Sequence, residues 1–143
     1  MGGRSERFLE VSARLTGFGR VALLGTGMTD AYLRALDAVL PAGTVDELLA
    51  AGEHDDGVSE LLDDAKLGPV ARNLILLWYC GTWTALPDEW RAAYGTSPLD
   101  TTRVESAAAY QAGLQWVAAG AHPAGARQQG FGAWAVPPER AVA

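Results

Sequence analysis

Residues 74–80 read LILLWYC, and this apolar run decides the fold class that we predict. Pro69, five residues earlier, is well placed in the first turn of a helix, where its missing N–H has no partner to lose. The pattern after Pro69 begins amphipathic and becomes apolar on all sides, which is typical of a helix that is buried all round. We therefore predict a helix over residues 69–80, buried in the chain's own core or against a partner.

The rest of the chain also shows helical spacing. Apolar residues recur every three or four positions, which indicates amphipathic helices, and no segment alternates as a strand does. The predicted helices cover residues 5–17, 30–40, 44–51, 58–66, 87–94 and 101–119. We predict an all-α fold with a single helical domain over residues 1–119. An irregular tail rich in Gly, Pro and aromatic residues follows over residues 120–143, and we expect it to pack on a partner.

Two helix starts carry capping signals. Thr44 and Glu47 have the spacing of a capping box, in which the threonine accepts from the first turn and the glutamate reaches back. Thr101 or Thr102 is placed to cap the last helix.

Residues 21–32, VALLGTGMTDAY, raise the question of a dinucleotide-binding loop. Such a loop needs a preceding strand, a third small residue and an acid at the end of a second strand. Here the apolar run is short, Asp30 stands where the third glycine belongs, and no second strand is predicted. We interpret the segment as a loop in which Thr29 or Asp30 caps the next helix, and we expect no nucleotide to bind there.

Composition narrows the function classes. The 143 residues carry a net charge of −6 and no basic stripe, which argues against nucleic acid as a ligand. One cysteine excludes an internal disulfide and a zinc site built from several cysteines. The longest apolar run is far shorter than the roughly 20 residues of a membrane-spanning helix. No signal peptide is visible, so we expect a cytoplasmic protein; the alternative is a periplasmic one whose leader was removed.

Isolated reactive residues do not form a convincing active site. His54 lies in the acidic segment GEHDDG and His122 in GAHPAGA, and neither has a clear partner in sequence. Cys80 follows an apolar run, as an inert packing cysteine does. We predict no catalytic residue, no metal site and no cofactor on this chain, with catalysis by His122 as the less favoured alternative.

Aromatic residues crowd the C-terminal half. Phe131 and Trp134 lie in the tail, where ordering the backbone costs roughly 1–2 kcal/mol per residue and must be offset by burial. They pack either on the chain's own helices or on another protein, since tryptophan is a favoured interface anchor. The residues alone do not decide between these two interpretations.

Three segments resemble the small (gamma) subunit of the sorbitol dehydrogenase family: WYCGTW (78–83), ESAAAYQAGLQW (105–116) and GAHPAGARQQGFGAWAVPP (120–138). FLEVSARLTG (8–17) is similar to that family's first helix. The resemblance implies a helical accessory subunit that is not itself an enzyme. It implies a large partner of the glucose-methanol-choline type, which carries the FAD and performs the oxidation, and a cytochrome subunit in exported complexes.

The resemblance also implies which residues lie at or near the subunit contact. These are Trp78, Tyr79, Trp83, Trp116, His122, Phe131 and Trp134. The alternative function is a stand-alone helical chaperone or interaction module that releases its client.

Overall fold

The computed structural model describes residues 3–53 and 57–122. Their elements, in chain order, are α1 (Arg4–Thr16), α2 (Arg20–Gly25), α3 (Thr29–Val39), α4 (Thr44–Ala51), α5 (Gly57–Asp63), α6 (Leu67–Cys80), β1 (Thr82–Trp83), α7 (Asp88–Tyr94), β2 (Arg103–Val104), α8 (Ala107–Ala112) and α9 (Leu114–Ala119). The described chain is therefore all-α apart from two short strands, which confirms the predicted fold class.

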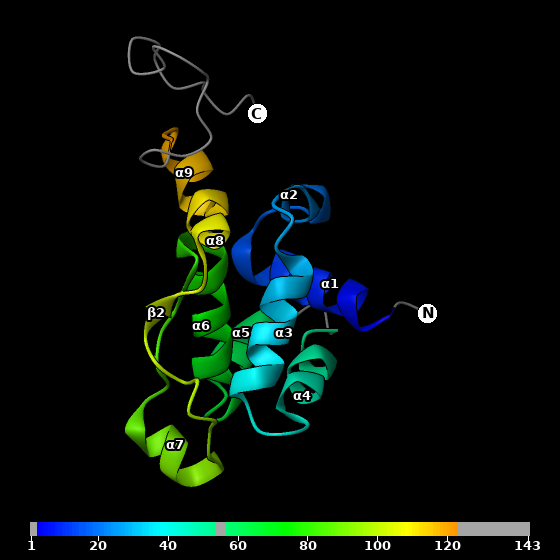
Figure 1. Cartoon of the computed structure of the whole chain (residues 1–143). Coiled ribbons are helices and arrows are strands. Elements are labelled where there is room, and N and C mark those ends of the chain that lie inside the picture. The colour runs from blue at the N-terminus through cyan, green and yellow to red at the C-terminus, as the bar shows by residue number, and fades with distance from the viewer. Residues whose placement is uncertain (1–2, 54–56, 123–143) are drawn as a thin grey trace.

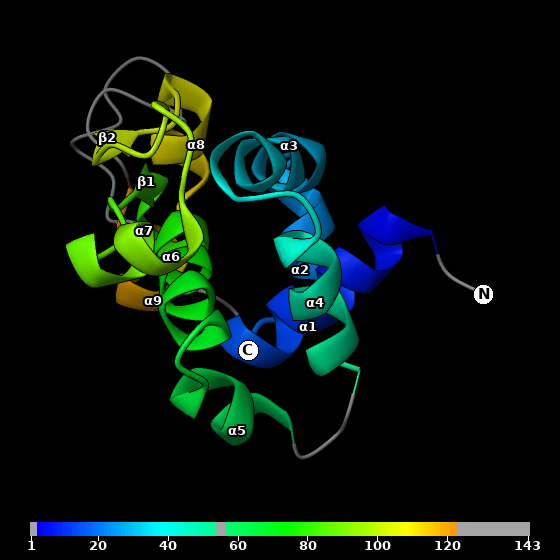
Figure 2. The same ribbon diagram turned by 90° about the horizontal axis from the view of Figure 1, so that it is seen from below.

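Helix α6 is the centre of the packing. It contacts the three helices α1, α4 and α5. It also contacts β1, α8 and α9, which lie near its C-terminal end. Figures 1 and 2 show the other helices arranged around it. Leu74, Leu77 and Trp78 are fully enclosed, but Leu76 is 41 % exposed. The chain's own core therefore does not bury residues 74–80 on all sides, and burial of the remaining face against a partner stays a prediction.

Residues 20–25 form a short helix, α2, where we predicted a loop. Residues 20–25 are therefore not the strand that precedes a dinucleotide-binding loop. The predicted cap is wrong, because α3 begins at Thr29 itself and its N-cap, Met28, makes no side-chain cap bond. Instead, Thr26 Oγ1 accepts a hydrogen bond from the Met28 N–H at 3.1 Å, which holds the turn before α3.

The predicted capping box at Thr44 does not form. The N-cap of α4 is Gly43, whose φ of +86° lies in the left-handed region that glycine tolerates, so Thr44 is already helical. Because the cap lies one residue earlier, Glu47 is the fourth residue of the helix rather than the third, the position that a capping box requires. Its carboxylate pairs instead with Lys66 Nζ at 2.9 Å.

The predicted single helix over residues 101–119 does not form. One short strand and two short helices stand in its place. Arg103 and Val104 form β2, which pairs antiparallel with β1 in the register Thr82↔Val104. Ser106, rather than Thr101 or Thr102, caps α8, because its hydroxyl accepts from the Ala109 N–H at 3.0 Å. Gly113 then separates α8 from α9.

Candidate partner interface

Two of the segments on which the expected family resemblance rests, residues 78–83 and 105–116, pack against each other. Gly81 O accepts a hydrogen bond from the Glu105 N–H at 2.8 Å. The neighbouring residues on each side form the antiparallel strand pair β1 and β2. Cys80 Sγ lies 3.8 Å from Gln115 Oε1. Segments that are separated by more than twenty residues in sequence therefore form one unit at the C-terminal end of α6 (Figure 1).

Two glycines make this packing close enough to exclude any side chain. A Cβ on Gly81 would lie 2.5 Å from the backbone carbon of Ala109, and the φ of Gly81 is +67°. A Cβ on Gly113 would lie 2.6 Å from the carbonyl oxygen of Tyr79. Each glycine thus abuts the backbone of the opposite segment, so the unit depends on both.

Two of the predicted interface residues, Trp78 and Trp83, lie in the chain's own core. Both are only 1 % exposed. The Trp78 ring packs between Phe8, at 6.2 Å between ring centroids, and Tyr32, at 4.9 Å. These tryptophans therefore offer no surface to a partner in this structure, because the helices around α6 already enclose them.

The other predicted interface residues differ in their placement. Tyr79 is half-buried; its hydroxyl donates to Thr16 O at 2.8 Å and its ring meets Phe18 edge-on. Trp116 is half-buried, and its Nε1–H donates to Tyr110 O at 2.8 Å. His122 is exposed at the end of the described chain. Phe131 and Trp134, with the tail after His122, lie outside the described residues.

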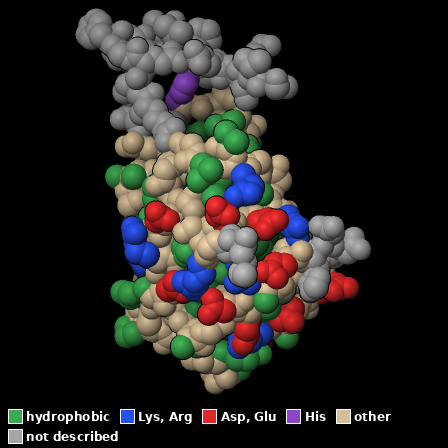
Figure 3. All heavy atoms as spheres, turned by 90° about the vertical axis from the view of Figure 1, so that its right-hand side faces the viewer, with side chains coloured by type: hydrophobic (Ala, Val, Ile, Leu, Met, Phe, Trp, Pro, Cys, Tyr) green, Lys and Arg blue, Asp and Glu red, His purple; other side chains and the backbone are tan. Residues whose placement is uncertain are grey.

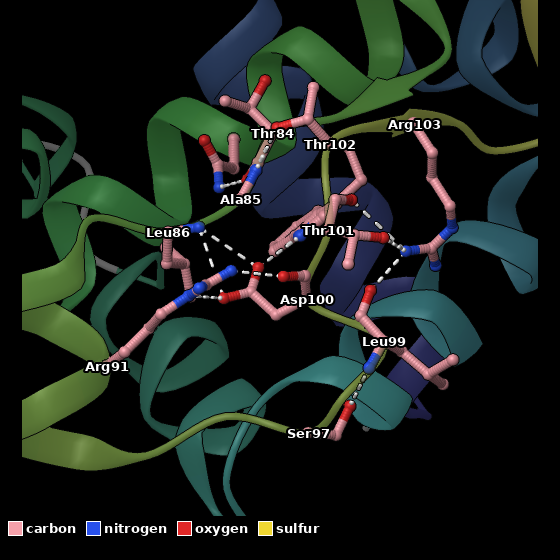
Figure 4. Close-up of polar contacts among 12 residues, drawn as sticks. Thr84, Ala85, Leu86, Arg91, Ser97, Leu99, Asp100, Thr101, Thr102 and Arg103 are labelled. Carbon is pink, nitrogen blue, oxygen red and sulfur yellow. Dashed lines mark hydrogen bonds and ion pairs between the residues drawn. The ribbon is translucent and has the colours of Figure 1, made fainter.

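The buried carboxylate of Asp100, which the sequence analysis missed, binds Trp83 of β1 and the chain just after it. Asp100 is 3 % exposed and accepts from Trp83 Nε1 at 2.8 Å, from Arg91 Nε at 2.8 Å and from the Leu86 N–H (Figure 4). Arg91 also donates to the backbone carbonyl of Asp100. Burial by itself raises the pKa of Asp100, but these hydrogen bonds and the charge of Arg91 together hold it below the ordinary value.

No local signal in the sequence marks Asp100 as special. It follows Pro98 and Leu99 in a segment that reads as a polar turn, and its donors lie 9 to 17 positions away. The sequence offers one general clue to such a residue. A buried tryptophan such as Trp83 needs an acceptor for its indole N–H.

Charge is distributed unevenly over the described surface. We define the charge-poor end as α2, residues 73–80 of α6, and helices α8 and α9; within these described segments Arg20 is the sole charged residue. Figure 3 shows acidic and basic side chains gathered over the middle of one face, with hydrophobic side chains above them and also near the bottom. The charge-poor end also exposes large apolar side chains, namely Val21, Leu24, Leu76 and Val117.

The described residues place no group of catalytic side chains together. Cys80 is a free, half-buried thiol that lies beside the neutral amide of Gln115, and His122 forms no ion pair with a carboxylate of residues 3–53 or 57–122. No three potential metal ligands cluster in the ranges 3–53 and 57–122, and no helix there is long and apolar enough to cross a membrane. His54 lies outside the described residues.

Comparisons of the chain with family models, with curated proteins and with solved structures find no significant match.

Proposed function

We propose that this chain is a non-catalytic small subunit of a heteromeric FAD-dependent sugar, polyol or alcohol dehydrogenase. It would bind and stabilise a large flavoprotein subunit of the glucose-methanol-choline type, which holds the FAD and oxidises the substrate. The observation that carries the proposal is that residues 78–83 pack against residues 105–116, the two described segments that resemble the family, at an end of the molecule where Leu76 and Val117 expose apolar side chains. Large apolar surface on a small chain favours a protein partner.

The test is co-expression of the tagged full chain with each glucose-methanol-choline type flavoprotein of its genome. The purified material is analysed by light scattering for mass and by visible absorption for flavin and haem. We expect a complex of fixed stoichiometry that is heavier than the 15.1 kDa chain and carries a flavin spectrum. A haem band in addition would identify a cytochrome as a third subunit.

Two other results would contradict the proposal. A colourless, stable monomer that ignores every flavoprotein, with a cooperative thermal transition of its own, would contradict the proposal. Association that is transient and substoichiometric would favour the chaperone alternative instead. In either case, activity measurements on His122→Ala would then be the next step.

A further inference from the structure

Residues 19–27, GRVALLGTG, form a strap that links α1 to α3, with helix α2 at its middle. In Figure 1, α2 lies at the end of the described fold opposite α7. Of the residues in α2 only Leu23 is buried, whereas Val21 is 84 % and Leu24 is 54 % exposed. The strap is therefore held to the core mainly by one side chain.

The hydrogen bonds of the strap are local. The Leu23 N–H donates to Gly19 O at 3.1 Å, and Thr26 Oγ1 donates to Leu23 O at 2.6 Å. Thr26 Oγ1 also accepts from the Met28 N–H at 3.1 Å. Within the described chain, the strap makes no hydrogen bond or ion pair to a residue outside the range 19–28, and α2 packs chiefly on α1. Opening the strap would therefore break few contacts with the rest of the fold.

Glycines stand at both ends of α2 without a packing reason. Gly19 precedes the helix at a φ of −72°, and Gly25 is its last residue. A Cβ at either position would meet nothing within 4 Å, and neither residue is in the left-handed region, so alanine would fit at both. Glycine adds backbone freedom there once the strap leaves the core, because it has more accessible conformations than any other residue.

We propose that residues 19–27 are a hinged strap, which swings open about Gly19 and Gly25 while the helices around α6 stay folded. A helix as short as α2 is marginal in water unless packing supports it, and here the support is Leu23. Segments with few buried contacts open at a lower free energy than the core beside them. The inference goes beyond the proposed function and does not depend on it.

Opening of the strap uncovers apolar surface of α1. Residues of α1, α2 and α3 line a groove of about 400 Å³, and the strap supplies Arg20, Leu24 and Gly27 to its wall. Leu9 of α1, only 3 % exposed, also lines this groove. When α2 moves away, Leu23 leaves the core and Leu9 becomes accessible. The strap therefore acts as a gate over the apolar surface of α1.

The experiment is native-state hydrogen exchange of the full chain, followed by NMR at several low urea concentrations. The reporters are the amides of Leu23, Thr26 and Gly27, each hydrogen-bonded within the strap. The reference amides are those of Leu77 and Trp78, inside α6. We expect the strap amides to exchange about a hundredfold faster or more than the reference amides. Their rates should barely change with urea, because a small opening exposes little surface.

The variants Gly19→Ala and Gly25→Ala test the hinges. Each should slow the exchange of the strap amides by about two- to fivefold, because alanine restricts the open state more than the closed one. Gly3→Ala is the matched control. Gly3 is the N-cap of α1 at a φ of −66°, and its Cβ position is equally uncrowded. Because Gly3 lies outside the strap, this variant should leave the exchange of the strap amides unchanged.

Three results would overturn the inference. Strap amides that exchange at the rate and with the urea dependence of the α6 amides would show that the strap opens only when the whole chain unfolds. Exchange at the rate of an unprotected amide would show that α2 is not formed at all. Equal effects of Gly19→Ala and Gly3→Ala on the strap amides would show that Gly19 is not a hinge. The subunit function is decided separately, by the co-expression test.

Discussion

The surface of α1, α3 and α4 and the packing between α6 and the segments that follow it are held together in different ways. On the first, Arg4 bridges Asp37 at 2.7 Å and Asp46 at 3.1 Å, and Arg7 pairs with Glu53 at 2.7 Å, all with substantial solvent exposure. In the second, the contacts are buried or half-buried: the hydrogen bonds to Asp100, the close approaches at Gly81 and Gly113, and the hydrogen bond of the Tyr79 hydroxyl. Exposed ion pairs contribute little each, whereas an unpaired buried group is costly.

The largest effect should come from Asp100→Ala. This change leaves the indole N–H of Trp83 and the Leu86 N–H without their acceptor and leaves Arg91 without its counter-ion. We expect a loss of about 3 kcal/mol in the free energy of unfolding, measured with urea. Asp63→Ala, at an exposed position in α5, is the control and should change stability by less than about 0.5 kcal/mol. Equal effects of the two would remove the distinction between the regions.

The same carboxylate predicts a pH dependence. Its folded pKa is lowered below 3.8, so its contribution to stability is present above pH 3.8 and is lost as the pH falls through the folded pKa. Unfolding free energies of the unchanged chain and of Asp100→Asn should therefore differ by a constant amount near neutral pH. The difference should shrink below pH 3.8. A difference independent of pH would show that Asp100 does not titrate in this way.

Gly81→Ala tests the close packing of the two family-like segments. The added Cβ would meet the backbone of Ala109, which cannot yield as a flexible side chain would. We expect a loss of about 2–3 kcal/mol, measured by thermal unfolding. Gly120→Ala is a matched control, since Gly120 has the same φ of +67° but nothing within 4 Å of its Cβ position. Backbone strain alone should cost about 1 kcal/mol there, and equal losses would refute the packing argument.

Two tyrosines should respond differently to the loss of a hydroxyl. The Tyr79 hydroxyl donates to Thr16 O at 2.8 Å, so Tyr79→Phe should cost about 1 kcal/mol. The buried Tyr32 hydroxyl has no hydrogen-bond partner among the described residues, and burial, together with the charge of Glu105, raises the pKa of Tyr32. Tyr32→Phe should therefore be neutral or stabilising in urea unfolding. A large loss at Tyr32 would reveal a partner for that hydroxyl, such as a bound water.

Among the substitutions that remove a contact, the smallest loss should come from the exposed ion pairs. Arg4→Ala removes contacts to Asp37 and Asp46 and should cost only about 0.5–1 kcal/mol. The cost should fall as salt is added, because ions screen exposed charges. Arg34→Ala, which removes no hydrogen bond or ion pair within the described chain, serves as the reference. A loss that salt does not reduce would indicate that Arg4 acts by packing rather than by charge.

Local patterns in the sequence predicted most of the helices. Apolar spacing placed the stripe of α3, with Tyr32, Leu36 and Val39 all buried, because a repeat near 3.6 residues depends only on neighbours along the chain. It also placed α1, which ends at Gly17 in the left-handed conformation. Capping was predicted less well, since a shift of one residue at Gly43 was enough to remove the capping box.

By itself, the sequence determined the all-α fold class and the central role of the apolar helix that became α6, because both follow from local periodicity and composition. Only the tertiary structure decided that Trp78 and Trp83 face inward, that Asp100 is buried under its donors, and that residues 101–119 break at β2 and Gly113. Each of these depends on contacts between segments far apart in sequence. The exposed apolar face of α2 emerged for the same reason: neighbouring helices determine which side of a short helix they cover.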